Sequence, residues 1–116
     1  MKELTLTAES LAGPIRLALS WGHRRGGKMP RFIIERNTGQ LTRQELDAAA
    51  RRSNAVLAEM DGVSWIRSYV SHADGKIFCE YEAPNADLIR EHARRAGLPA
   101  DAVREIQLTI NPDMFR

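Results

Sequence analysis

The sequence predicts an α+β domain built on a four-stranded antiparallel sheet, and three observations lead to that fold class. Two segments, from Thr42 to about Met60 and from Asn85 to Ala96, carry apolar residues at helical spacing. An Ala-Asp-Gly sequence at 73–75 predicts a hairpin, because Asp and Gly both tolerate positive φ. Four further segments have the composition or alternation of strands, and they are residues 31–36, 63–72, 76–82 and 105–110.

The helices have recognisable ends. Thr42 and Glu45 form a capping box that opens the first helix, which we expect to end at Gly62. Asn85 is a natural N-cap for the second helix, and Gly97 is its expected C-cap. The order βαββαβ is the ferredoxin-like arrangement, with both helices on one face of the sheet. Right-handed crossovers place the first and third strands in the middle.

Length and charge exclude several classes of protein. The 116 residues suffice for one domain, and the net charge is +2. The first 28 residues carry a net charge of +3, so the rest of the chain carries −1, which argues against nucleic-acid binding. No apolar run reaches the roughly 18 residues of a membrane helix. The single cysteine, Cys79, has no partner for an internal disulfide, and we therefore expect a cytoplasmic protein.

The first 28 residues differ in character from the rest of the chain. Pro14 interrupts their apolar patches, and a Gly-rich basic stretch precedes Met29. We expect 1–28 to be a flexible extension, or a mis-annotated one if natural translation begins at Met29. They make a poor targeting peptide because Pro14 and Arg16 break the apolar region. The single ferredoxin-like domain is expected to span 29–116.

The second strand suggests an interaction surface. By the period of two, Trp65, Arg67 and Tyr69 share one side, and the aliphatic residues between them suit the helix-covered side. We therefore expect Trp65, Arg67 and Tyr69 to look outward. An aromatic face that no helix covers usually needs a partner. Homodimerisation is the first expectation and a ligand groove is the alternative.

Three side chains beyond residue 28 are candidate metal ligands, namely His92, His72 and Cys79, because imidazole and thiolate suit transition metals. Each also has a structural interpretation. His92 lies on or beside the apolar stripe of the second helix, His72 precedes a hairpin turn, and Cys79 lies in a central strand where free cysteine packs as a small apolar residue. The spacing alone leaves these alternatives open.

Two stretches, "MPRFIIER" and "SYVSHADGKIFCEYEAPNADLIREHARRAGLPADAVREI", resemble a bacterial family of small ferredoxin-like proteins that includes a nickel-binding member. The resemblance covers most of residues 29–110. It implies a dimer of βαββαβ subunits that holds divalent metal, nickel in particular, at its surface, and no known reaction. His92 and Cys79 lie in matching motifs. Where members often read "HSYV", this chain has Arg67-Ser68-Tyr69-Val70, and arginine cannot ligate a cation.

The expected function is therefore binding or sequestration of nickel or a similar divalent ion, with His92, His72 and Cys79 as ligands. A dimeric interaction module without metal is the first alternative. A small enzyme is the second, either of the dimeric α+β-barrel type or a tautomerase with Pro30 as an N-terminal base. The residues favour a non-catalytic protein, without nucleic-acid or membrane partners.

Overall fold

A computed structural model describes residues 29–116 of the chain. The expectations for residues 1–28 lie outside this range. Pro30–Ile106 forms one compact unit, and Gln107–Arg116 falls outside that unit and is described by itself. Within the described residues no helix is long and apolar enough to cross a membrane.

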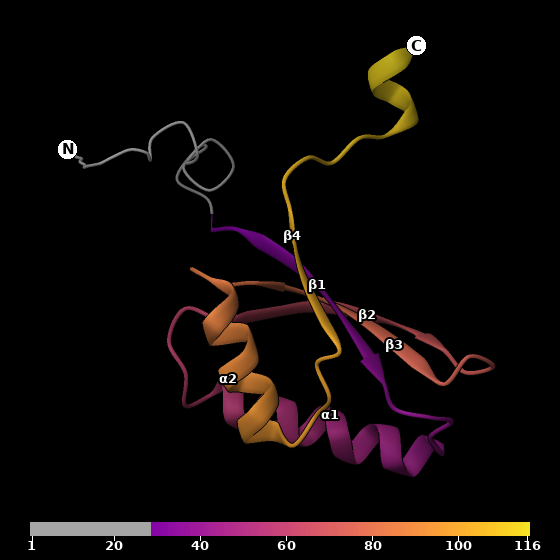
Figure 1. Ribbon diagram of the computed structural model, residues 1–116, viewed down its shortest axis with the longest axis vertical. Helices are drawn as coiled ribbons and strands as arrows, with labels where there is room; N and C mark the ends of the chain where they lie inside the picture. The colour runs from indigo at the N-terminus through magenta and orange to yellow at the C-terminus, as the bar shows by residue number, and fades with distance from the viewer. Residues whose placement is uncertain (1–28) are drawn as a thin grey trace. The chain divides into compact units, whose positions relative to one another are not determined.

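The compact unit has the predicted order βαββαβ (Figure 1). Its elements are β1 (Arg31–Asn37), α1 (Arg43–Leu57), β2 (Ser64–Ser71), β3 (Lys76–Glu82), α2 (Ala86–Ala96) and β4 (Ala102–Ile106). The strands lie in the order β2-β3-β1-β4, every neighbouring pair is antiparallel, and both helices lie on one side of the sheet. The ferredoxin-like α+β fold, with the first and third strands in the middle, is confirmed.

The helices begin and end at the predicted capping residues, with one exception. The Thr42 hydroxyl accepts from the Glu45 amide, and the Glu45 carboxylate accepts from the Thr42 amide. Asn85 caps α2, which ends at Gly97 in the left-handed conformation. Helix α1 ends at Leu57 and not at Gly62. After Leu57 the backbone forms the tighter hydrogen bonds of a 3-10 turn, between residues three apart, such as Glu59 N to Val56 O.

The core lies between the sheet and the helices. Alternate residues of the central strands β1 and β3 are buried, as the period of two requires. The buried apolar cluster consists of Phe32, Ile34, Val63, Ile77, Cys79, Tyr81, Ala83 and Ile89. Burial of this apolar surface is the main force that holds the helices on the sheet.

The last strand is shorter than the sequence predicts and is shifted toward the N-terminus. The expectation was 105–110, but β4 is Ala102–Ile106 and pairs only with β1. Its last pair joins Ile106 to Arg31, and the residue before Arg31 is Pro30, which has no N–H to donate. Alternation continues to Ile110, but the ladder with β1 stops at Ile106.

A close backbone approach holds the β2–β3 hairpin against the loop after β1. The Gly75 carbonyl accepts from the amides of Thr38 and Gly39, both at 3.0 Å. Gly75 has φ +64°, and a Cβ there would lie 2.9 Å from the Gly39 Cα. Only glycine fits, so the position of the hairpin depends on this residue.

We predict that Gly75→Ala destabilises the protein more than Gly39→Ala. Both glycines have positive φ, which costs an alanine about 1 kcal/mol. Only Gly75 adds a backbone clash, because a Cβ on Gly39 meets nothing within 4 Å. Urea unfolding of the two variants measures the difference. Equal losses would show that the hairpin yields without cost.

Candidate functional site

His92 lies in the interior of the protein. Its side chain is 0% exposed, and its Nε2 lies 3.1 Å from the Ser53 hydroxyl and 3.3 Å from the Ser53 carbonyl oxygen. Nδ1 has no hydrogen-bond partner among the described residues. If the proton is on Nε2, it can be donated to the Ser53 carbonyl, and Nδ1 is then an acceptor without a donor. A second proton would bury a charge and an unpaired donor, so the neutral ring suits this site.

Burial lowers the pKa of His92 below its usual value, and the nearby Arg36 cation lowers it further, while the bond to the Ser53 backbone raises it. The Tyr81 ring lies 5.3 Å from the imidazole, centroid to centroid. Burial also raises the pKa of Tyr81, against the opposing effects of Ser53 and Arg36. Both side chains are therefore neutral at neutral pH.

Arg36 connects this group to the centre of the sheet. Its side chain is 2% exposed and donates to the Pro99 carbonyl at 2.7 Å, to the Tyr81 hydroxyl at 3.4 Å and to the Cys79 Sγ at 3.3 Å. The Tyr81 hydroxyl also contacts the Ser53 Oγ at 3.3 Å. A continuous polar chain thus runs through the core from Cys79 to His92.

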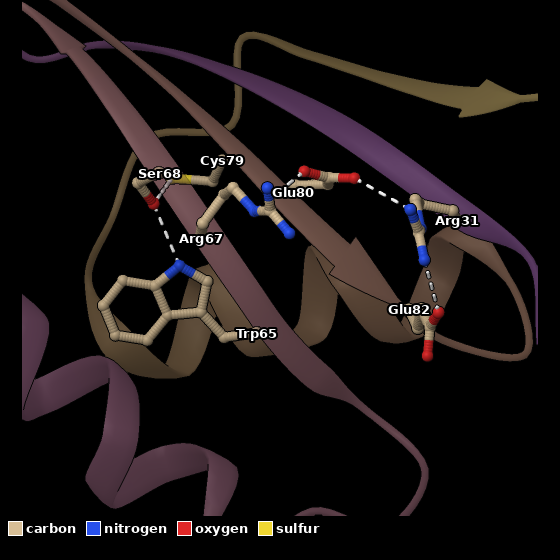
Figure 2. A network of polar contacts seen from close by, with 7 residues as sticks. All are labelled: Arg31, Trp65, Arg67, Ser68, Cys79, Glu80 and Glu82. Atoms are coloured by element: carbon tan, nitrogen blue, oxygen red, sulfur yellow. Dashed lines mark hydrogen bonds and ion pairs between the residues drawn. The ribbon is translucent and has the colours of Figure 1, made fainter. Parts of the chain in front are cut away.

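Cys79 is buried and 5% exposed. Besides Arg36, its sulfur accepts from the Ser68 hydroxyl at 3.0 Å, and Ser68 in turn accepts from the Trp65 indole at 2.9 Å (Figure 2). Two donors already occupy the thiol. A ligand from solvent would have to displace packed side chains to reach it.

His72 differs from the other two candidates because it is exposed, at the end of β2. The backbone turns directly after it, and its carbonyl accepts from the Gly75 amide at 3.0 Å. On the same turn the Asp74 carboxylate is exposed and accepts from the Ser71 hydroxyl at 2.9 Å. The hairpin therefore presents an imidazole and a carboxylate to solvent.

The three predicted ligands do not come together. No group of three or more His, Cys, Asp and Glu side chains suited to a metal ion occurs within residues 29–116 of one chain. His92 and Cys79 belong to the buried network, and His72 lies on the exposed hairpin. Metal binding by these residues stays a prediction.

The side of the sheet away from the helices carries ion pairs between neighbouring strands (Figure 2). Glu80 pairs with Arg31 at 3.2 Å and with Arg67 at 3.6 Å, and Glu82 pairs with Arg31 at 3.0 Å. Lys76 pairs in the same way with Glu35 at 2.9 Å. These carboxylates already have basic partners, so they do not form a cation site.

The expectation that Trp65, Arg67 and Tyr69 share one face is wrong for Trp65. Strand β2 has a bulge between Trp65 and Arg67, so Trp65 pairs with the buried Tyr81 while Arg67 pairs with Glu80. Trp65 packs against the core cluster. Arg67 and Tyr69 lie on the uncovered side, where Tyr69 is 54% exposed. The role of that face as a dimer or ligand surface stays a prediction.

A pocket of about 300 Å³ opens beside the hairpin. Its lining combines apolar side chains of the sheet and α1 with polar side chains, namely Thr38, Gly39, Leu41, Arg43, Leu46, Val70, Ser71, His72, Lys76 and Ile77. This lining includes no carboxylate to orient His72 as a general base.

Residues 32–106 match a protein family described as nickel responsive protein, SCO4226-like. The match includes every helix and strand of the compact unit except the first residue of β1. The chain belongs to this family. The resemblance predicted from the sequence is confirmed.

A solved structure of the SCO4226-like family has the same fold. It is described as the crystal structure analysis of SCO4226 from Streptomyces coelicolor A3(2), and it is 27% identical to this chain with a TM-score of 0.63. The alignment covers 69% of this chain and 99% of that one. No curated protein matches significantly. Gln107–Arg116 lies beyond the residues that match the family.

Sequence reasoning missed the polar core of this family member. Arg36 is the last residue of the first predicted strand, 31–36, and the period of two from Phe32 and Ile34 puts it on their buried side. Ser53 interrupts the apolar stripe of α1 for a reason, since it is the hydrogen-bond partner of both Tyr81 and His92. The period was the signal that could have revealed both residues.

We predict that the free energy of unfolding falls as the pH drops below about 6.5, the ordinary histidine pKa. The pKa of folded His92 is lowered, so in this window the unfolded chain binds a proton that the folded chain refuses. Above neutral pH both states are neutral and the contribution is constant. Urea unfolding between pH 7 and 5 measures the slope.

His92→Gln should flatten that slope, whereas His72→Gln, which removes an exposed histidine, should leave it in place. The carboxylate Glu91, whose pKa is lowered chiefly by Arg94, acts below this window. A slope that survives His92→Gln unchanged would contradict the buried neutral imidazole.

Proposed function

We propose that this protein is a non-catalytic homodimer that binds Ni²⁺ or a similar divalent ion at a surface site to which His72 contributes. One observation carries the choice of residue: of the two histidines in the described part of the chain, only His72 is exposed. Imidazole is a favoured ligand of nickel. Membership in the nickel-responsive family supports the choice of metal.

The donors of one described chain do not fit a nickel ion by themselves. Three converging donors are absent from residues 29–116, and the hairpin supplies only His72 and Asp74. A second copy of the chain would supply the remaining donors, which is why the proposal includes the dimer. His92 and Cys79 take the part of structural residues, because their polar atoms face the protein interior.

The hairpin is a suitable place for such a ligand. Its position is held by the bonds from Thr38 and Gly39 to the Gly75 carbonyl, so a ligand on it starts from an ordered backbone. Lys76 next to the turn donates to Glu35 and Asn37 at 2.9 and 2.7 Å. These bonds draw its ammonium group toward β1.

We predict that His72→Ala weakens Ni²⁺ binding to the tag-free full chain by at least about tenfold, since even outer-shell changes at metal sites cost this much. Isothermal titration calorimetry gives affinity and stoichiometry per chain. Ala73→Ser, on the same exposed turn, is the matched control and should bind as the wild type does.

Two further variants locate the site. His92→Gln should retain the nickel stoichiometry, and His23→Ala tests the remaining histidine of the sequence. Unchanged binding by His72→Ala would remove His72 from the proposal. The absence of binding by the wild type would remove nickel itself.

A dimeric interaction module without metal is the second candidate. The observation that favours it is the uncovered sheet face, where Tyr69 is 54% exposed and the Arg67 side chain is 59% exposed. An exposed aromatic side chain surrounded by ion-paired charged side chains is suited to contact another protein. The same calorimetric titration separates the two candidates, because only the first predicts a heat of binding when nickel is added.

A further inference from the structure

The pocket beside the hairpin contains apolar surface that the core does not bury. Val70 lies opposite Ile77 in the ladder between β2 and β3, so the two side chains share one face of the sheet. Ile77 belongs to the core cluster and is 8% exposed, whereas Val70 is 50% exposed. Both residues line the pocket. The packing of the core thus stops between these neighbours, and the apolar surface of the edge strand remains accessible in the pocket.

Two leucines complete the apolar part of the lining. Leu41 comes from the loop before α1 and Leu46 from the start of that helix, and both pack against the core. The capping box of Thr42 and Glu45 lies between them in sequence and fixes the residue at which the loop becomes a helix. An aliphatic group that enters the pocket therefore meets side chains held by an ordered backbone.

The polar side chains of the lining are hydroxyls and basic groups. The Thr38 hydroxyl donates to the Gly39 carbonyl at 2.8 Å. The Ser71 hydroxyl donates to Asp74 at 2.9 Å, and the Lys76 ammonium group donates to two side chains of β1. These three groups already have partners within the compact unit, so they are not the first choice for binding a ligand.

Arg43 has donors that are still available. Its Nε pairs with Asp47 at 2.9 Å, and no hydrogen bond or ion pair within residues 29–116 uses its two terminal Nη atoms. The side chain is 84% exposed and lines the pocket together with the exposed imidazole of His72. A guanidinium group presents N–H donors in a geometry that matches a carboxylate.

We propose that this pocket binds a short aliphatic carboxylate, with its carboxylate on the Arg43 guanidinium group and its chain against the four apolar side chains of the lining. The volume of about 300 Å³ lies at the lower end of the range for small-molecule sites and selects a small ligand. The lining has basic groups and no carboxylate, which favours an anion over a cation. Binding requires neither a metal nor a second copy, so this site is independent of the proposed nickel site even though His72 lines the pocket.

An NMR titration of the tag-free, ¹⁵N-labelled full chain with hexanoate tests the proposal, after a chelating resin has removed metal ions. Saturable shifts are expected for the amides of Leu41, Leu46, Val70 and Ile77. The expected dissociation constant is about 1 mM, as suits a ligand of so few atoms. Hexanol and hexylammonium should bind at least about fivefold more weakly, because neither offers a carboxylate to Arg43.

Three variants separate the two parts of the ligand. Arg43→Gln should raise the hexanoate dissociation constant about fivefold and leave that of hexanol within about twofold, since only the carboxylate contact is lost. Arg51→Gln is the matched control, because it removes an exposed arginine of the same helix outside the lining, and it should bind as the wild type does. Val70→Ser should weaken both ligands about threefold, because it removes apolar contact.

Several results would overturn the proposal. Hexylammonium that binds as tightly as hexanoate, or hexanoate binding that Arg43→Gln leaves unchanged, would remove the carboxylate site. Shifts confined to amides outside the lining, or no shifts at all, would remove the pocket. The dispersion of each NMR spectrum shows whether the variant is folded. Because the protein is free of metal in these titrations, their failure leaves the nickel affinity at His72 to be decided separately by calorimetry.

Discussion

The buried guanidinium of Arg36 is the interaction on which the interior depends. Arginine stays charged, and none of the ion pairs within the described residues involves it. Its desolvation is offset by a carbonyl, a phenol and a thiol, from Pro99, Tyr81 and Cys79. These partners come from β3 and from the connection between α2 and β4, so one side chain ties β1 to both.

The Arg36 cation also affects two of the candidate ligands, Cys79 and His92. It holds Cys79 and Tyr81 in fixed positions, and Tyr81 and Ser53 then fix the environment of His92. Burial is the main reason that the pKa of His92 is lowered, and the Arg36 cation disfavours protonation of the imidazole further. His92 and Cys79 thus contribute hydrogen bonds and packing to the fold, and of the three candidate ligands only His72 lies at the surface.

The fold could be predicted from the sequence because its signals are local. The capping box at Thr42, the cap at Asn85 and the hairpin at 73–75 each act within a few residues. The face of Trp65 could not be predicted, because alternation alone does not show where a bulge adds a residue. The roles of Arg36 and His92 depend on partners more than 35 residues away in sequence. Periodicity marks such positions as buried but does not reveal what they contact.

The proposed metal site depends on the division between interior and surface. The buried side chains of Pro30–Ile106 pack and hydrogen-bond with one another, and His92 Nδ1 is the only buried side-chain polar atom in the described residues without a partner. At the surface of residues 29–116, the hairpin presents the exposed imidazole of His72, and the uncovered side of the sheet presents Tyr69. An imidazole alone binds a metal weakly. A second copy of the chain doubles the number of donors, so dimerisation is the step that the proposed nickel site requires.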